Sequence, residues 1–466
     1  MTGAPPVAEL ATHAVTNQPP DYGGVDLFAT DAALAEAALR EGGAWVGAPL
    51  HDLGREAGGI DLLALGEAAN RHPPELAAFD RYGQRLDEVR FHPAYDALMA
   101  TAMRHGIHDV AWRAGRTGGH VLHAAMLAIF TQAEAGVMCP MSMTYASVPA
   151  LRHAAPAVRD LWIGRIVGGV YDALLRPVAD KQGATVGMAM TEKQGGSDVR
   201  ANTTRAEPDG ADGAVRLVGH KWFCSAPMSD GFLTLAQGEA GLSCYLVPRI
   251  LPDGTRNAIH LQRLKDKLGN RSNASAEIEY HGAWALPVGA PGRGVATIIE
   301  MVHHTRLDTL AGTLGIMRAA LARAAHHAAH RRAFQRRLID QPAMAAVLAD
   351  LAVEYEAAAV LVMRLARAFD AADGAESALA RLGVALGKFW LTRRCPGFVA
   401  ECLECLGGAG YIEEQALPRL YREAPLNAIW EGSGNVIALD VLRALARQPA
   451  AGAAVLAEIA AARGGH

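Results

Sequence analysis

The side chains best suited to chemistry are hydroxyls and a carboxyl that stand in glycine-rich segments. Residues 188–198 read MAMTEKQGGSD, where Thr191 and Ser197 carry hydroxyls and the glycines let a backbone approach a flat ligand closely. Residues 429–435 read IWEGSGN, where Glu431 follows an aromatic ring. A carboxyl in such a setting can have a raised pKa and act as a base. A Gly-Gly-Ser segment taken alone is more often a simple turn, so the functional interpretation needs support from other segments.

Two further segments offer an aromatic surface and a set of backbone amides. Residues 219–225 read GHKWFCS, and an aromatic pair followed by a hydroxyl can flank a ring system. The alternative for this segment is a strand in a protein core. Residues 405–411 read CLGGAGY, whose glycines can direct backbone N–H groups at a phosphate. The alternative there is a helix cap.

An arginine-rich segment allows three interpretations. Arg331 and Arg332 are followed closely by Arg336 and Arg337. A guanidinium donates two parallel hydrogen bonds, which suits a diphosphate. A solvated basic helix face is the more usual outcome of such a run. A surface for nucleic acid is the third interpretation, and the net charge of −4 weakens it.

Two pairs of residues have the spacing of metal ligands. Cys402 and Cys405 form a Cys-x-x-Cys without a second pair. His326 and His330 share a predicted helix face, but no carboxylate motif surrounds them. We therefore predict no metal site.

Length and composition agree with a globular protein of several domains. The chain has 466 residues, of which 51% are hydrophobic and 20% charged, and the net charge of −4 gives no general attraction to nucleic acid or anionic membranes. It contains no apolar run long enough for a membrane helix, and its start has no signal-peptide pattern. Six cysteines in such a long chain do not indicate a disulfide framework. We expect a cytoplasmic protein.

The type of secondary structure that must position these residues changes twice along the chain. After an extended arm, apolar residues at helical spacing predict helices over 30–43, 93–104 and 119–137, and again over 345–372. Short β-prone runs between Asp-Gly turns predict strands over 214–219, 232–237, 242–248 and 276–284. The sequence therefore predicts an arm and helical domain over 1–183, a β domain over 184–290, and a helical bundle with a short tail over 291–466.

Taken together and in this order, the segments resemble the acyl-CoA dehydrogenase flavoprotein family. The longest similar strings match its AidB-type branch, which is linked to DNA alkylation, and they cover 191–207, 217–227, 263–279 and 417–435. The resemblance implies an α+β fold with an N-terminal helical domain, a central antiparallel β domain and a C-terminal four-helix bundle. It also implies FAD between the β domain and the bundle, and a homotetramer built as a dimer of dimers.

The resemblance carries individual residues over to the cofactor and the substrate. The positions that match the family's flavin contacts are Met190, Thr191, Ser197, Phe223, Ser225, Arg331, Phe334, Gly407, Gly408, Ser433 and Asn435. Within this set the diglycine contacts the diphosphate, and Arg331 and Phe334 reach the FAD of the neighbouring subunit. Substrate contacts are implied for Ser197, Arg306 and Gly432. Glu431 stands at the usual position of the catalytic base, whereas the position used by a minority branch holds Thr305.

Several positions depart from the residues that the family usually has. Beside the hydride-accepting nitrogen, Phe223 replaces a Trp and Ser225 replaces a Thr. Glu404 stands where a Gln binds FAD, Gln335 stands where Gly follows the Phe, and Pro342 lies near another expected Gln. We therefore expect the flavin contacts to be rearranged in detail.

The resemblance leaves two functions open. The first is α,β-dehydrogenation of an acyl-CoA, with proton abstraction by Glu431, hydride transfer to the flavin, and reoxidation by an electron-transfer partner or oxygen. The second is an AidB-type flavoprotein with weak or no acyl-CoA activity that binds DNA or deactivates alkylating agents. In that branch DNA contact is ascribed to an additional C-terminal helical domain, and only residues 448–466 follow Arg447 here. We therefore expect a small-molecule substrate, and DNA binding is doubtful.

Overall fold

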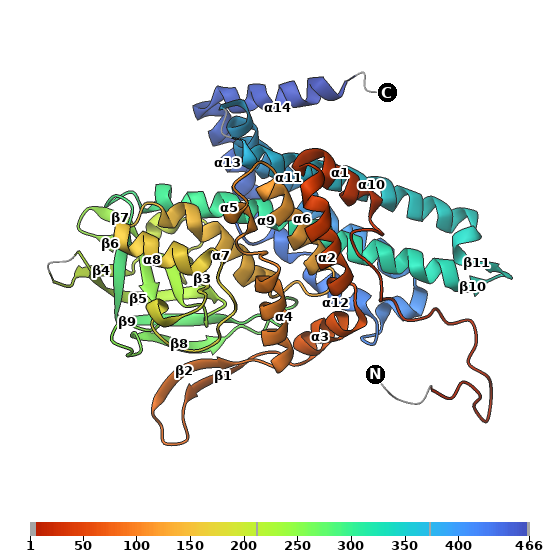
Figure 1. Ribbon diagram of the computed structural model, residues 1–466, viewed down its shortest axis with the longest axis horizontal. Helices are drawn as coiled ribbons and strands as arrows, with labels where there is room; N and C mark the ends of the chain where they lie inside the picture. The colour runs from red at the N-terminus through yellow and green to blue at the C-terminus, as the bar shows by residue number, and fades with distance from the viewer. Residues whose placement is uncertain (1–5, 211–212, 372–373, 464–466) are drawn as a thin grey trace.

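Helices form both ends of the chain and strands form its middle, as Figure 1 shows. This computed structural model describes residues 6–210, 213–371 and 374–463. In the view of Figure 1 the strands of the sheet gather at one side, and the long C-terminal helices run from them towards the opposite end. The expected α+β fold, with helical, β and helical regions in that order, is confirmed.

The N-terminal region begins with the predicted extended arm, over residues 6–31. Its helices are α1 (Ala32–Gly42), α2 (Gly47–Ala57), α3 (Ile60–Arg71), α4 (Pro93–Arg104), α5 (Val110–Arg113), α6 (Gly119–Thr131), α7 (Met138–Leu151) and α8 (Pro156–Ile166). The helix predicted over 119–137 ends earlier than expected, because α6 stops at Thr131 and residues 132–137 form a turn that leads to α7. Gly136 lies in this turn, where an added Cβ would collide with the hydroxyl of Ser272.

A β-hairpin interrupts these helices, and the sequence analysis missed it. Strands β1 (Glu75–Phe79) and β2 (Arg85–Arg90) pair antiparallel around a turn in which Gly83 has a φ of 83°. Asp87 of β2 accepts the N–H of Leu261 at 2.7 Å, which joins the hairpin to the β region. The segment lies between helical patterns, and its alternation of polar and apolar residues is too short to stand out from them.

The strands of the middle region form a sheet that closes on itself. They are β3 (Val186–Ala189), β4 (Arg205–Pro208), β5 (Val215–Ser225), β6 (Gly231–Gly238), β7 (Gly241–Pro248), β8 (Ile259–Leu264) and β9 (Ser275–Val288). Their order is β3-β6-β4-β5-β9-β7; β8 pairs with β9, and β7 also pairs with β6. The sheet is antiparallel as expected, except that β3 runs parallel to β6 and one residue pair joins β4 to β6 in parallel.

The C-terminal region is built from long helices. They are α9 (Gly294–His330), α10 (Pro342–Asp370), α11 (Gly374–Glu404), α12 (Ala416–Glu423), α13 (Gly434–Arg447) and α14 (Pro449–Ala462). The predicted helix over 345–372 is α10, and Pro342 occupies its first turn, where proline is tolerated. The tail predicted after Arg447 contains α14, which packs on α11. No helix within the described residues is both long and apolar enough to cross a membrane.

One apolar cluster joins the β region to both helical regions. It contains Tyr145 of α7, Leu233 of β6 and Met301 of α9, all buried. Met190 and Trp430, from two segments that the sequence singled out, pack against it as partly buried residues. The fold therefore places the loop after β3 near the loop before α13.

Candidate active site

Glu431 lies between α12 and α13 in a backbone conformation that non-glycine residues seldom adopt. Its φ is 58°, and such a conformation costs on the order of 1 kcal/mol unless its surroundings fix it. Buried Arg306 of α9 donates from Nε to the carbonyl of Glu431 at 3.1 Å. Buried Lys388 of α11 donates to the carbonyl of Gly432 at 2.8 Å. Two cations from two helices therefore fix the backbone of this residue.

The carboxylate of Glu431 is held by a hydroxyl that also faces a carbonyl. Thr305 Oγ1 lies 2.7 Å from Glu431 Oε2 and 3.1 Å from the carbonyl oxygen of Val302. The hydroxyl has a single hydrogen, so it donates to Glu431 while that group is ionised. Once Glu431 is protonated, the hydroxyl can turn to Val302 and accept a hydrogen bond instead. Thr305 thus serves both protonation states of the carboxyl.

The surroundings of Glu431 make its carboxyl hold a proton more tightly than an exposed glutamate does. Burial raises the pKa of this carboxyl above its ordinary value. The hydrogen bond from Thr305 and the charges of Arg306 and Lys388 lower the pKa, whereas the nearby charge of Asp308 raises it. A carboxyl with a raised pKa is a stronger base than one in water, which suits the role predicted for Glu431.

The two β-region segments singled out by the sequence lie side by side. Trp222 donates its backbone N–H to the carbonyl of Thr191 at 2.7 Å. Met190 is half-buried, whereas the ring of Phe223 is 45% exposed and is open to a ligand. Residues 188–198 and 219–225 therefore form one continuous surface.

A buried thiol lies near both this surface and Glu431. Burial raises the pKa of Cys139 to about 12, and the charge of Lys267 lowers it while that of Glu431 raises it. The nearby hydroxyl of Ser225 lowers it further. Ser225 and the predicted base are therefore neighbours of the same thiol.

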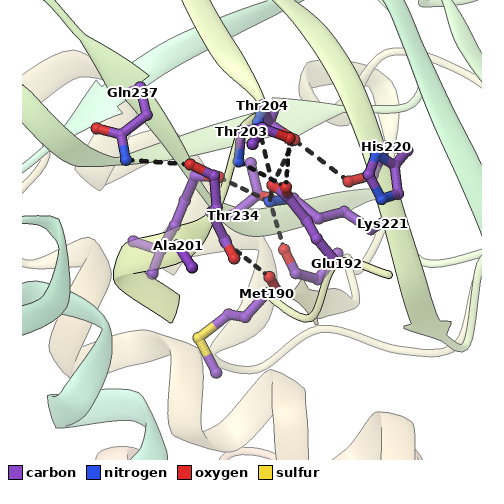
Figure 2. A network of polar contacts seen from close by, with 12 residues as sticks. Met190, Glu192, Ala201, Thr203, Thr204, His220, Lys221, Thr234 and Gln237 are labelled. Carbon is purple, nitrogen blue, oxygen red and sulfur yellow. Dashed lines mark hydrogen bonds and ion pairs between the residues drawn. The ribbon is translucent and has the colours of Figure 1, made fainter. Parts of the chain in front are cut away.

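A buried ion pair supports residues 188–198, and Figure 2 shows the network around it. Glu192 Oε1 lies 2.8 Å from Lys221 Nζ, and both side chains are shielded from solvent. Glu192 also accepts the N–H of Thr203 at 2.7 Å and the hydroxyl of Thr204 at 2.6 Å. Burial raises the pKa of Glu192, but the charge of Lys221 and these hydrogen bonds outweigh it and bring the pKa to about 2.

This ion pair was not predicted from the sequence, although it fixes the segment of the predicted flavin contacts. The carbonyl of Ala189 accepts the hydroxyl of Thr234 at 2.6 Å, and that of Met190 accepts the amide of Asn202 at 2.9 Å. An available signal was Lys221, a charged residue directly before the run of Trp222, Phe223 and Cys224 in β5. The network therefore holds the loop after β3 rigidly in front of the sheet.

Two predicted cofactor residues lie far from the β region, on a short hairpin. Strands β10 (Arg332–Ala333) and β11 (Arg336–Arg337) follow α9, and Figure 1 shows them protruding at the end of the molecule opposite the sheet. Phe334 and Gln335 form the turn with φ values of 50° and 68°, which explains why a glycine suits position 335. Phe334 is 94% exposed. Phe334 thus points outward from this chain, whereas Arg331 is half-buried.

The N-terminal arm fastens this hairpin. Asn17 donates from Nδ2 to the carbonyl of Arg332 at 2.9 Å and accepts the N–H of Arg332 at 2.7 Å. Arg331 donates to the carbonyl of Asn17 at 2.6 Å. Further along the arm, the rings of Tyr22 and His326 meet edge to face with centroids 5.4 Å apart. The arm therefore runs along the second half of α9.

The remaining predicted residues lie mostly at the surface. Those that are exposed are Ser197, Gly407, Gly408, Ser433 and Asn435. Arg306, predicted to contact substrate, binds Asp440 at 2.7 Å in addition to Glu431. Glu404 is exposed at the end of α11, and Gln341, before Pro342, donates to the carbonyl of Ala333 at 3.1 Å.

The residues with metal-like spacing have other surroundings. Cys402 and Cys405 are buried free thiols. His326 lies 2.8 Å from the carbonyl of Pro20, and its ring adjoins that of His330. In the part of the chain that the structure describes, no three His, Cys, Asp or Glu side chains gather as metal ligands.

Comparison with known proteins identifies the group to which this arrangement belongs. Residues 17–173 match the family model of the adaptive response protein AidB N-terminal domain, and residues 187–283 and 292–446 match those of the acyl-CoA dehydrogenase middle and C-terminal domains. The AidB protein of Escherichia coli strain K12 is 49% identical over 94% of this chain and 81% of its own length. This chain belongs to the acyl-CoA dehydrogenase family. Within that family it is of the AidB type, and it is an oxidoreductase that uses a flavin.

Other proteins agree with this chain in sequence or in fold. Acyl-CoA dehydrogenase family member 11 of Caenorhabditis elegans is 31% identical over 81% of this chain and 63% of its own length. The crystal structure of C. elegans ACDH-11 in complex with C11-CoA has a TM-score of 0.84 at 27% identity, covering 96% of this chain and 78% of that one. The Bd2924 apo-form has a TM-score of 0.84 at 30% identity, covering 93% of this chain and 88% of that one.

The residues present fit the flavin that this family uses. A cavity of about 290 Å³ adjoins the loop between β8 and β9, with Lys265, Lys267 and Asn273 in its wall. The carboxamide of Asn273 is buried, and among the described residues neither its Oδ1 nor its Nδ2 has a hydrogen-bond partner. A flavin ring presents N–H and carbonyl groups along one edge, and a carboxamide can pair with both kinds of group.

Proposed function

We propose that this chain is an FAD-dependent acyl-CoA dehydrogenase in which Glu431 is the catalytic base. The observation that carries this proposal is the geometry of Glu431: a half-buried carboxyl with a raised pKa, on a backbone fixed by Arg306 and Lys388. The structure of ACDH-11 with C11-CoA supports acyl-CoA as the class of substrate.

The proposed reaction is the removal of two hydrogens from the α- and β-carbons of an acyl thioester. Glu431 takes the α-proton, and FAD, when bound, would supply the acceptor for the hydride of the β-carbon. The backbone N–H of Glu431 donates to the thioester carbonyl and stabilises the negative charge that develops there. As Glu431 becomes protonated, the Thr305 hydroxyl turns to Val302, so that no lone pair or hydrogen is left without a partner.

The proposed FAD site is shared between two chains. Met190, Thr191, Phe223 and Ser225 of one chain surround the flavin ring, while Arg331 and Phe334 of its partner approach the rest of the cofactor. The 94% exposure of Phe334 at the tip of an arm-fastened hairpin supports this arrangement. We propose that the protein forms a dimer of dimers. We also propose that its reduced flavin is reoxidised by an electron-transfer partner or by oxygen.

The identity to the E. coli AidB protein favours one second candidate function. In that case the flavoprotein would have weak or no activity on acyl-CoA, and would bind DNA or deactivate alkylating agents. The two candidate functions differ in whether an acyl-CoA reduces the flavin.

Anaerobic titration with isovaleryl-CoA and longer acyl-CoAs tests the first function. We expect the absorption band of the oxidised flavin to bleach on mixing, and Glu431→Gln to abolish bleaching while it retains the flavin. If no acyl-CoA bleaches the flavin while duplex DNA is bound at physiological salt, the second function replaces the first. The DNA measurement needs a salt series, because non-specific binding weakens steeply as salt rises.

A further inference from the structure

A hydrogen-bond chain leads from a lysine to the hydroxyl predicted to lie beside the reactive edge of the flavin. Lys267 lies in the loop between β8 and β9, and its Nζ donates to the hydroxyl of Ser275 at 3.2 Å. Ser275 Oγ lies 3.3 Å from Ser225 Oγ. The two serines are register partners, since Ser225 ends β5 and Ser275 begins β9.

The chemistry of the three groups allows all the hydrogen bonds of the chain to run in one direction. An ammonium group can only donate, so Ser275 accepts from Lys267 and its own hydrogen is available for Ser225. With Ser275 as the donor to Ser225, the hydrogen of Ser225 is free to point away from the sheet. Aligned donors strengthen one another, because each hydroxyl is polarised by the one before it.

Lys267 has no carboxylate partner of its own. Among the ion pairs of the described residues none includes Lys267, whereas the neighbouring Lys265 binds Glu277 at 2.6 Å. Lys267 also donates to the carbonyl of Asn273 at 2.6 Å, and the charged or titratable groups that influence it are Cys139, Glu134 and Glu423. Burial lowers the pKa of this lysine to about 8, so it carries its charge at neutral pH.

We propose that Lys267 is a positioning and charge-supplying residue that acts through Ser275 and Ser225 to make the bound flavin a better hydride acceptor. The proposal rests on the proposed function, which places Ser225 beside the hydride-accepting nitrogen. A positive charge at the start of the chain stabilises the electron-rich reduced flavin relative to the oxidised form. It also strengthens the hydrogen bond that Ser225 offers to the ring.

Lys267→Met tests the proposal in the flavin-loaded protein, with the midpoint potential and the affinity for sulfite as readouts. Sulfite adds to an electron-poor flavin, so we expect its affinity to fall about tenfold and the potential to become more negative. Ser275→Ala, which leaves the ammonium in place, shifts both readouts in the same direction by a smaller amount. Lys267→Arg, which keeps the charge, restores most of the effect.

Lys265→Met is the matched control, because it removes one positive charge from the same loop. The ammonium of Lys265 is balanced by Glu277 and lies over the ring of Trp222, so we expect at most a twofold change. If Lys267→Met fails to hold flavin, Ser275→Ala decides the question alone.

Two results separate the proposal from the function on which it rests. If Ser225→Ala shifts the potential while Lys267→Met and Ser275→Ala leave it unchanged, the chain from Lys267 is overturned and the placement of Ser225 stands. If Ser225→Ala leaves the flavin spectrum, the potential and flavin retention unchanged, the placement of Ser225 itself is wrong.

Discussion

The two buried cations beside Glu431 bind its backbone segment and not its carboxylate. Arg306 and Lys388 each donate to a carbonyl in the short segment of Glu431 and Gly432, and both cations are buried. Their charges lower the pKa of the carboxyl without an ion pair that would quench it as a base. The same two contacts hold the strained φ of Glu431 in place. Residues with strained backbone angles are common at functional sites.

Thr305 is the direct partner of that carboxylate, and its loss has a predicted effect on pH dependence. The hydroxyl lowers the pKa of Glu431, so Thr305→Val raises this pKa further. Because the reaction needs the ionised base, we expect the acidic limb of the kcat/KM profile to move to higher pH. Thr305→Ser keeps the hydroxyl and should follow the parent profile. An unchanged profile in Thr305→Val would contradict this role.

At the scale of elements, the pair of Glu192 and Lys221 ties the loop after β3 to strand β5. Both groups are shielded, and Glu192 is surrounded by donors from the loop that leads into β4 (Figure 2). Such a pair gives little net stability over an apolar pair, but removing one partner leaves an isolated buried charge. Its role is therefore to set the geometry of residues 188–198.

Lys221→Met is expected to lower the free energy of unfolding by about 3 kcal/mol, because it leaves the Glu192 carboxylate unpaired. Urea unfolding of the flavin-free protein measures this loss. The double variant Glu192→Gln with Lys221→Met removes both charges and should recover a substantial part of it. Lys193→Met, at an exposed neighbouring position, is the control and should change stability little. Equal losses in the single and double variants would show that packing, and not the charge, is responsible.

Elements were predictable from the sequence where their signal is local. Helix α4 and strand β7 follow the predicted ranges 93–104 and 242–248 closely, because each pattern lies within one segment. The hairpin of β1 and β2 was missed, since it is short and flanked by helical patterns. The partners of Glu431 were not predictable either, because Thr305 and Lys388 reach it from two separate helices.

For the whole molecule, the main feature is the separation of the sheet from the β10–β11 hairpin. They lie at opposite ends in Figure 1, so one chain does not bring all the predicted cofactor residues together. The resemblance predicted both sets of residues, and their separation supports the proposal that the site is shared between two chains. The hold of the arm on the hairpin could not be predicted, because Asn17 lies far from Arg332 in sequence.

Arg331→Ala is expected to weaken flavin retention about tenfold, since it removes a charged donor from the proposed neighbouring site. Flavin release during dialysis and thermal unfolding of the apoprotein measure the two effects separately, and the unfolding temperature should stay unchanged. Arg336→Ala on the same hairpin is the control. Asn17→Gly, which keeps the positive φ of 58° without strain, should cause a smaller loss by loosening the hairpin. Full retention in Arg331→Ala would contradict the shared site.

The contact between Asn17 and Arg332 joins positions 315 residues apart, which has a consequence for biogenesis. During synthesis the arm leaves the ribosome early, and at 5–20 residues per second its docking site follows roughly 15 to 60 seconds later. Closing so long a loop is also slow compared with forming α9 itself. The arm is therefore made well before the site on which it docks, so the β10–β11 hairpin is fastened only after α9 and the hairpin itself have been translated.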